Sequence, residues 1–268
     1  MMINIVSDKN VANNKLVSKE EIEELLKKDS AKIYEVIRVV KGRPVFLKEH
    51  YDRMNESIRL SGLKGVLDYE HYKRSAEMLI EVNNLLNCNI RVSYYFTHED
   101  ILLFYFIESH YPSKIQFQEG VDTVTVKMHR KNPNVKAFEK NFKEEVQRVI
   151  EDTESFEAIL VNDDNTVSEG SKSNIFFVKG KKIITSPDEA VLLGVTRNKV
   201  IEVCMANNIE VEKRTVNFDE LNSFDATFIT GTSNDVLPIR KIDEIHYNSA
   251  ENDVVREVSR LYLDEMGK

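Results

Sequence analysis

The sequence predicts an α+β protein divided into two domains. Its 268 residues are enough for one large domain or two modest ones with a sizeable core. Apolar residues at helical spacing and alternating strand-like runs occur in both halves of the chain. Residues 109–120 are polar and contain a proline, which is typical of a domain linker. We therefore expect domains at residues 1–115 and 121–268.

The composition is that of an ordinary globular protein, with 41% hydrophobic and 31% charged residues. A formal net charge of -8 argues against a broad nucleic-acid-binding surface. The chain has no apolar run of about 18 residues and no N-terminal secretory pattern. We therefore expect a cytoplasmic protein without a membrane span. Cys88 and Cys204 lie among apolar neighbours without metal-ligand spacing, which predicts two reduced core thiols and no metal site.

In the first half of the chain, turn signals separate helical and strand-like segments. Residues 18–21 fit a capping box that starts a helix, and no strand is predicted before it. Residues 41–44 form a turn between two β-like runs. The predicted elements, in order, are a helix at 18–29, strands at 32–40 and 45–46, helices at 47–60 and 69–86, and strands at 89–96 and 101–107.

The second half is dominated by short strand-like runs broken by turn residues, which is typical of a β-meander. Thr196 is the predicted N-cap of a helix. The predicted elements, in order, are a strand at 121–128, a basic loop at 129–134, a helix at 136–151, strands at 158–161, 174–178 and 183–184, a helix at 196–207, a strand at 209–216, a helical turn at 218–222, a strand at 226–230, and a helix with an apolar stripe at 254–262.

Glu169 is the first candidate functional residue. It stands beside Gly170 between two strand-like runs, where a buried acceptor could serve chemistry. An ordinary polar turn is the alternative interpretation, and short stretches of this kind usually have that meaning.

Two glycine-containing loops could bind a phosphate. The loop at 194–196 precedes a helix, so free backbone amides, the helix dipole and the Thr196 hydroxyl converge there. The loop at 231–233 follows a strand and could form an anion-binding nest. Each motif alone is more often a structural cap or turn.

Lys136 is the third candidate, at the start of a helix with an apolar face. A partly dry site would lower the pKa of its amine and leave the neutral form that makes a Schiff base. The alternative is a solvated surface lysine, and Arg53 could equally be a helix-surface charge. Lys127, Arg130 and Lys131 are either solvated loop charges or neighbours that lower the pKa of Lys136.

Taken in order, these segments resemble the fold-type IV, class IV pyridoxal-phosphate enzymes. That group contains branched-chain aminotransferases, D-amino acid aminotransferases and aminodeoxychorismate lyases. The resemblance extends from about residue 33 to residue 243. It rests on Ser-Glu-Gly-Ser-Lys-Ser-Asn-Ile-Phe at 168–176, Leu-Leu-Gly-Val-Thr-Arg at 192–197, Thr-Gly-Thr-Ser at 230–233 with Val-Leu-Pro-Ile at 236–239, Tyr-Glu-Val-Ile-Arg at 34–38, and Glu-His-Tyr-Asp-Arg-Met at 49–54.

The resemblance implies a smaller N-terminal α/β sandwich and a larger, β-barrel-like C-terminal domain with helices that binds pyridoxal 5'-phosphate. Lys136 would carry the cofactor as an internal aldimine and move the proton between the substrate Cα and the cofactor C4'. Glu169 would hydrogen-bond the pyridine nitrogen and favour the protonated ring. The other implied cofactor-binding residues are Arg53, Ser173, Asn174, Leu192, Val195, Thr196 and Thr232. The substrate-side candidates are Tyr34, Arg38, Arg91 and Ser233, with Tyr94 and His98 also considered.

The expected function is that of an aminotransferase acting on a small amino acid and a 2-oxo acid, in a homodimer that binds neither nucleic acid nor membrane. A lyase that releases pyruvate and 4-aminobenzoate from aminodeoxychorismate is the first alternative. A catalytically silent dimer that binds pyridoxal phosphate is the second. The subgroup-specific runs of the D-amino acid and branched-chain enzymes are absent, so the substrate stays open.

Overall fold

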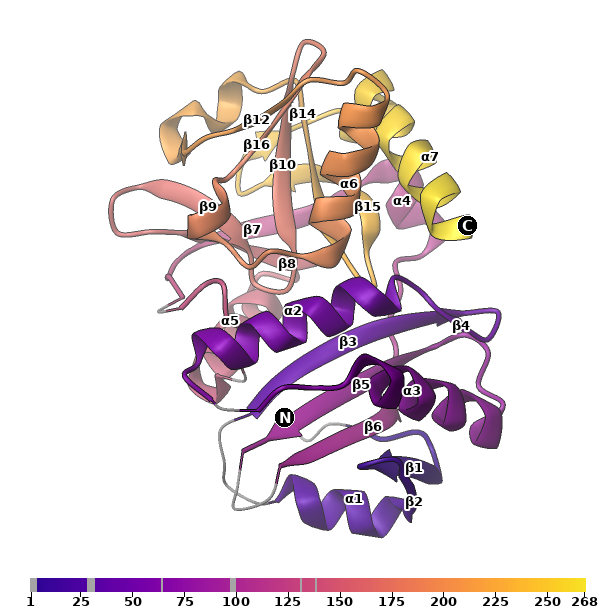
Figure 1. Ribbon diagram of the computed structural model, residues 1–268. Coiled ribbons are helices and arrows are strands. Elements are labelled where there is room, and N and C mark those ends of the chain that lie inside the picture. Colours follow the sequence, from indigo (N-terminus) through magenta and orange to yellow (C-terminus); the bar gives the residue numbers. More distant parts are fainter. Residues whose placement is uncertain (1–3, 28–31, 64, 97–99, 131, 138) are drawn as a thin grey trace. The chain divides into compact units, whose positions relative to one another are not determined.

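The computed structural model describes residues 4–27, 32–63, 65–96, 100–130, 132–137 and 139–268 (Figure 1). The chain folds into two compact units. The N-terminal unit comprises Met1–His110 and Val135–Phe138, and the C-terminal unit comprises Tyr111–Asn134 and Glu139–Lys268. The predicted α+β class is confirmed, because each unit combines helices with a β-sheet.

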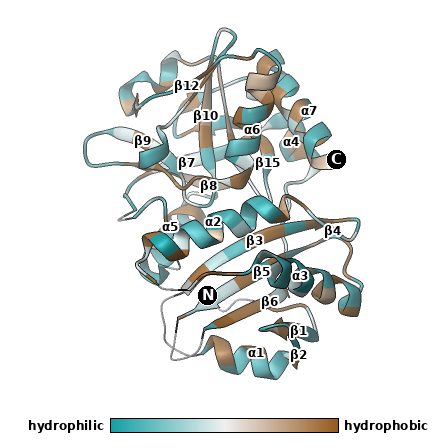
Figure 2. Cartoon of the chain, in the orientation of Figure 1, coloured by the Kyte–Doolittle hydropathy of each residue, from teal (hydrophilic) through white to brown (hydrophobic). Residues whose placement is uncertain are grey.

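A six-stranded sheet in the order β2-β1-β6-β5-β3-β4 forms the centre of the N-terminal unit. Its strands are β1 (Lys9–Ala12), β2 (Lys15–Ser18), β3 (Lys32–Val40), β4 (Arg43–Pro44), β5 (Cys88–Tyr95) and β6 (Ile101–Ile107). Its helices are α1 (Lys19–Leu26), α2 (Leu47–Leu60) and α3 (Tyr69–Asn83). The apolar sides of α2 and α3 pack on β3, β5 and β6 in one core. The hydropathy colouring of Figure 2 agrees with this packing. Strand β6 is mainly hydrophobic, and the side of α2 that faces the viewer is mainly hydrophilic.

The prediction that no strand precedes the first helix was wrong. β1 pairs with β6, placing Val11 opposite Phe104, and β2 pairs with β1. The side chains of β2 are mostly exposed, so its sequence carries little apolar alternation. These short segments adopt strand conformation because they pair with residues distant in the sequence. Such a tertiary effect cannot be predicted from local sequence patterns. The helix predicted at 47–60 is confirmed with those bounds.

The C-terminal unit contains a ten-stranded sheet in the order β12-β11-β10-β14-β15-β7-β8-β9-β13, with β16 paired to β15. Its strands are β7 (Val121–Lys127), β8 (Glu157–Val161), β9 (Thr166–Gly170), β10 (Asn174–Lys179), β11 (Lys182–Thr185), β12 (Val211–Lys213), β13 (Val216–Asn217), β14 (Ala226–Gly231), β15 (Asp235–Ile242) and β16 (Ile245–His246). Its α-helices are α4 (Lys114–Glu119), α5 (Lys140–Asp152), α6 (Val195–Ala206) and α7 (Asp253–Gly267), and 3-10 turns form at Asp188–Ala190, Phe218–Ser223 and Ser249–Glu251.

This second sheet wraps around one apolar core. Alternate residues of most of its strands, such as Ile175 and Phe177 of β10, point into the same buried cluster. The pairing runs as an open path from β12 to β13, so the described strands are barrel-like without forming a closed barrel. Helix α5 packs outside β7 and β8 through Phe142 and Val146.

Three predicted elements in this half need correction. Helix α5 begins at Lys140 rather than at 136, because residues 136 and 137 are extended beside β3, where Ala137 bridges Ile33. Helix α6 begins at Val195 with Gly194 as its N-cap, so Thr196 lies inside the helix. The strand predicted at 209–216 is divided into β12 and β13.

Both cysteines are free and buried, and burial raises the pKa of the Cys204 thiol to about 12. The prediction of core thiols is therefore confirmed. Within the described ranges, no helix is both long and apolar enough to cross a membrane.

Candidate active site

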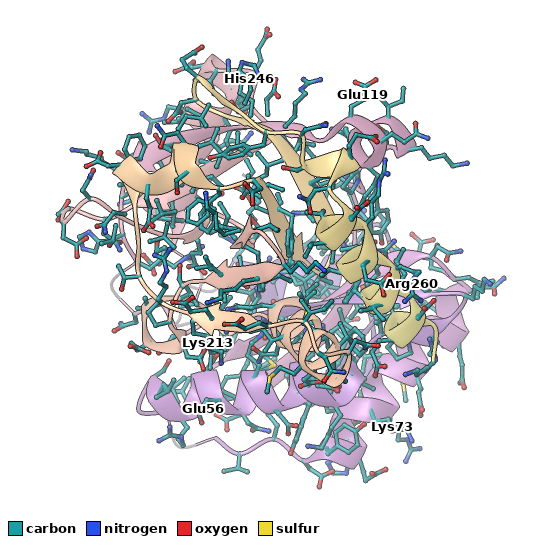
Figure 3. The ribbon with its side chains drawn as sticks, turned by 90° about the horizontal axis from the view of Figure 1, so that it is seen from above. Glu56, Lys73, Glu119, Lys213, His246 and Arg260 are labelled. Atoms are coloured by element: carbon teal, nitrogen blue, oxygen red, sulfur yellow. The ribbon has the colours of Figure 1, made fainter. Side chains whose placement is uncertain are left out.

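Charged side chains in this protein fall into two groups. Many exposed ones pair within their own helix. Arg260 of α7, which is labelled in Figure 3, is an example, since it donates to Glu257 and Asp264. Such solvated pairs contribute little to stability and do not indicate a site. Glu35 and Glu169, in contrast, are 0% and 3% exposed. Because burying a carboxylate is costly unless partners satisfy it, the surroundings of these residues indicate where function lies.

In the N-terminal unit, Lys136 is held at the edge of β3 by its backbone. Its carbonyl accepts from the Tyr34 amide at 3.2 Å, and its amide donates to Ser57 Oγ at 3.3 Å. The Lys136 ammonium lies 5.2 Å from the centroid of the Tyr34 ring. The lysine side chain is half-buried. Fixed backbone and an aromatic neighbour limit where the amine can point.

The face of the sheet that carries Tyr34 also carries Arg91. The Arg91 guanidinium stacks 4.0 Å from the centroid of the Tyr34 ring and is 8% exposed. Ser93 and Tyr105 hydrogen-bond each other at 2.9 Å on the same face. A planar cation fixed on an aromatic ring suits the recognition of a carboxylate.

Beneath α2, Glu35 forms a buried network with Arg53 and His50. The Glu35 carboxylate accepts from Arg53 Nε at 2.8 Å and Nη2 at 2.5 Å, and His50 Nδ1 lies 2.7 Å from its Oε2. Burial alone would raise the pKa of Glu35, but Arg53 and His50 outweigh it and hold the pKa at about 2. Burial lowers the pKa of His50, so its imidazole is neutral near pH 7. The network therefore fixes the orientation of the Arg53 guanidinium.

In the C-terminal unit, Glu169 stands at the end of β9 with both carboxylate oxygens engaged. Oε1 accepts from Arg130 Nε at 2.9 Å. Oε2 accepts from the Asn174 side-chain amide at 3.2 Å and from the Leu192 backbone amide at 3.0 Å. Arg130 also donates to the carbonyl of Ser171 at 2.5 Å. Arg130 is therefore a partner of Glu169 rather than a solvated loop charge.

The N-terminus of α6 has the properties of an anion cradle. Its N-cap residue is Gly194, which has no side chain to cap the helix, and the Val195 and Thr196 residues that open it are buried. Arg197, fully buried, donates to the Ser186 carbonyl at 2.8 Å and ties this turn to the preceding loop. At the end of β14, opposite Asn174, the buried Thr230 hydroxyl has no partner among the described residues. Uncapped amides and an unsatisfied buried hydroxyl fit a polar ligand with an anionic group.

Gly194 is required at this position by close packing. A Cβ there would overlap the side-chain oxygen of Asn174. We expect Gly194→Ala to displace Asn174 and to lower the free energy of unfolding by about 1–3 kcal/mol. Urea denaturation measures the change. Gly267→Ala is the control, because a Cβ there meets no atom within 4 Å, and it should match the parent. A Gly194→Ala variant as stable as the parent would contradict the packing shown here.

The predicted site residues divide between the two units. Those in the N-terminal unit are Tyr34, Arg38, Arg53, Arg91 and Lys136. Those in the C-terminal unit are Glu169, Ser173, Asn174, Leu192, Val195, Thr196, Thr232 and Ser233. Of these, Ser173 donates its hydroxyl to Glu157 at 3.0 Å, and Arg38, Thr232 and Ser233 are half-buried.

Two further substrate-side candidates do not join this group. Tyr94 lies in the core beneath α2 and α3, on the face of β5 opposite Arg91. His98 lies outside the described residues.

Sequence reasoning missed Glu35, His50 and Glu157. Glu35 had a visible signal, because it occupies a core-facing position of β3 between Ile33 and Ile37. A charged residue in such a position needs a partner, and a cation on the following helix was available. Glu157 had no comparable signal, since its partners come from a distant turn.

Comparison with known proteins identifies clear relatives. A family model described as "Amino-transferase class IV" matches residues 32–242. A D-alanine aminotransferase of Bacillus licheniformis is 28% identical over 224 residues, which cover 79% of this chain and 78% of that protein. An aminodeoxychorismate lyase of Bacillus subtilis is 21% identical over 249 residues, covering 87% and 86%. The crystal structure of a branched-chain aminotransferase from Thermoproteus uzoniensis with norvaline shares the fold, with a TM-score of 0.84, 22% identity, and coverage of 97% of this chain and 95% of that one.

Proposed function

The chain belongs to the class IV aminotransferases, a family of pyridoxal-phosphate-dependent enzymes, and we propose that it transfers an amino group between an amino acid and a 2-oxo acid. The observation that carries the proposal is the position of Asn174. Its amide donates to Glu169, and its oxygen lies against Gly194 at the start of α6. One asparagine therefore links a buried carboxylate to an uncapped helix N-terminus. Pyridoxal 5'-phosphate carries a pyridine nitrogen and a phosphate that suit these two features.

In the C-terminal unit, the residues fit this cofactor. Glu169 would accept a hydrogen bond from the pyridine nitrogen, and its pairing with Arg130 keeps the carboxylate oriented. The Val195 and Thr196 amides, the Thr196 hydroxyl and Thr232 would bind the phosphate. Leu192 would pack against the ring. Ser173 contributes indirectly, because its hydroxyl supports the turn between Glu169 and Asn174.

In the N-terminal unit, Arg53 would supply the cation for the phosphate. Lys136 would bind the cofactor covalently and then carry the proton between the substrate Cα and the cofactor C4'. The cofactor, when bound, supplies the electron sink that makes cleavage of the Cα–H bond feasible. A neutral His50 and an ionised Glu35 hold Arg53 in one orientation.

Substrate recognition would fall to the face of the N-terminal sheet that carries Tyr34 and Arg91. Both substrates, an amino acid and a 2-oxo acid, carry a carboxylate. The guanidinium of Arg91, which stacks on the Tyr34 ring, can donate two parallel hydrogen bonds to such a carboxylate. Arg38 on β3 and Ser233 after β14 are the remaining candidates for contact with substrate.

A lyase acting on aminodeoxychorismate is the second candidate, favoured by the similarity to the Bacillus subtilis enzyme. Both reactions need the same proton abstraction by Lys136, so the site residues alone do not separate them. We also propose that the chain forms a homodimer, which light scattering of the purified protein would measure.

The test is a panel of L- and D-amino acids, each incubated with purified protein, pyridoxal phosphate and either 2-oxoglutarate or pyruvate. We expect the added 2-oxo acid to be converted into the corresponding amino acid in at least one mixture. Release of pyruvate from aminodeoxychorismate, without transfer in any mixture, would favour the lyase instead. Protein that stays colourless after the cofactor is added would contradict both enzymes and the silent cofactor-binding dimer.

A further inference from the structure

Glu157, the first residue of β8, is a buried carboxylate that the proposed cofactor contacts leave unexplained. It is 2% exposed. Its Oε1 accepts from Ser171 Oγ at 2.6 Å and from the Ala158 amide at 2.9 Å. Its Oε2 accepts from Ser173 Oγ at 3.0 Å and from the Lys172 amide at 3.2 Å. Three of these four donors belong to one short turn.

That turn joins β9 to β10. The Gly170 amide donates to the Ser173 carbonyl at 2.8 Å and closes the turn, and the Ser171 amide donates to the Ala158 carbonyl at 2.8 Å. Glu169 comes immediately before the turn and Asn174 immediately after it. The geometry of the turn therefore sets the positions of the two residues that would face the cofactor ring.

The turn is tight enough to need this support. A Cβ at Gly170 would overlap the Ser173 hydroxyl, so glycine is required where the serine side chain folds back. Without the Glu157 carboxylate as acceptor, the Ser173 hydroxyl would lose its hydrogen bond and could rotate out of this position. Glu157 supplies an acceptor to Ser171 and Ser173 together, while Arg130 holds the Ser171 carbonyl.

The donors to Glu157 are all neutral hydroxyl or amide groups. Desolvating a carboxylate is expensive, and no cation among these four donors offsets that cost. An apolar residue in place of Glu157 would leave the hydroxyls of Ser171 and Ser173 and the Lys172 amide without this acceptor. The glutamate therefore specifies one conformation of the turn.

We propose that Glu157 is a positioning residue that fixes the turn at 170–173 and thereby aims the Glu169 carboxylate and the Asn174 amide at the cofactor ring. This inference rests on the proposed function for the identity of the ligand. The positioning itself is a property of the protein without ligand, and it can be measured separately.

The first experiment uses Glu157→Gln without cofactor. Glutamine keeps one acceptor but replaces the other with a donor that opposes the donors of the turn. We expect amide hydrogen exchange in a peptide covering 168–176 to become at least about 10-fold faster, because the turn opens locally. The control is Asp243→Asn in the same unit. It removes a carboxylate that accepts from the Thr125 amide at 2.9 Å and from the Thr125 hydroxyl. Unchanged exchange at 168–176 in Glu157→Gln would overturn the inference.

The second experiment adds pyridoxal phosphate. We expect Glu157→Gln to weaken cofactor binding by about 10–100-fold, as loss of an outer partner does for metal ligands, and to shift the visible absorbance of the bound cofactor. Asp243→Asn should lower the melting temperature without either change. Parent-like affinity and spectrum in Glu157→Gln would overturn the inference and leave the proposed function intact. A parent protein that binds no cofactor would instead overturn the proposed function.

If Glu157→Gln does not fold, the double variant Ser171→Ala with Ser173→Ala replaces it in both experiments. That variant keeps the carboxylate and removes two of its donors. The expected changes are the same in direction, and parent-like exchange and affinity would overturn the inference.

Discussion

Replacing Lys136 with alanine is expected to abolish amino-group transfer while the protein stays folded. Transfer should fall by at least about 10³-fold, because the variant would lack both the proposed covalent attachment and the proposed acid–base group. The visible absorbance of the bound cofactor should be lost as well. The backbone contacts of Lys136 with Tyr34 and Ser57 do not use the lysine side chain, so the fold should be retained.

The matched control is Lys140→Ala, which removes an exposed lysine at the start of α5. It should keep the activity and the spectrum of the parent. Activity is assayed with the amino acid that is the best donor in the panel. Absorbance spectra report the bound cofactor, and circular dichroism reports the fold. A Lys136→Ala variant with parent-like absorbance would mean that another lysine holds the cofactor.

Replacing Glu35 with alanine is expected to destabilise the protein by about 3–5 kcal/mol, the usual cost of breaking a buried ion pair from one side. The substitution leaves Arg53 and His50 without the carboxylate that both contact. Urea denaturation followed by circular dichroism measures the loss. Cofactor affinity should fall too, because the guanidinium loses its fixed orientation.

The pH dependence of stability gives an independent test of the same network. The pKa of Glu35 falls from its ordinary value of 4.5 to about 2 on folding, so the folded state binds the proton less readily than the unfolded state. Its stabilisation is therefore complete above pH 4.5 and is lost as the pH falls toward 2. A shift of this size corresponds to about 3 kcal/mol. Glu35→Ala should remove this component of the pH dependence.

The control for Glu35 is Glu56→Ala, which breaks an exposed pair with Arg59 on α2. It should leave stability close to that of the parent. If Glu35→Ala were no more destabilising than Glu56→Ala, the buried network would not hold Arg53 as described.

Local patterns predicted the elements whose residues carry strong periodicity. Helix α2 has apolar residues repeating on one face, and its predicted bounds match the structure. Strands β1 and β2 were missed, because their conformation depends on pairing with β6. The start of α5 was misplaced for a similar reason. Its first predicted residues, at 136 and 137, pair with β3, about a hundred residues earlier in the chain.

The candidate site was predictable to the extent that it follows sequence motifs. Glu169 stands in one of the motifs on which the resemblance to the family rests, and the structure adds that Arg130 and Asn174 hold it. The partner of Arg130 lies 39 residues away, beyond the reach of local patterns. The carboxylate of Glu157 is bound by three consecutive residues, 171–173, of the turn between β9 and β10. Only the folded structure shows that these residues lie beside it. A residue that positions another side chain is harder to predict from sequence motifs than a residue that would itself contact the ligand.

The central claim is that Lys136 holds pyridoxal phosphate. Borohydride treatment of the cofactor-loaded protein fixes the cofactor permanently to the lysine that carries it. Peptide mass spectrometry then identifies that residue among the lysines of the chain. We predict a phosphopyridoxyl mass on the peptide that contains Lys136 and on no other in stoichiometric amount. The same modification at a different lysine, or none at all, would contradict the claim.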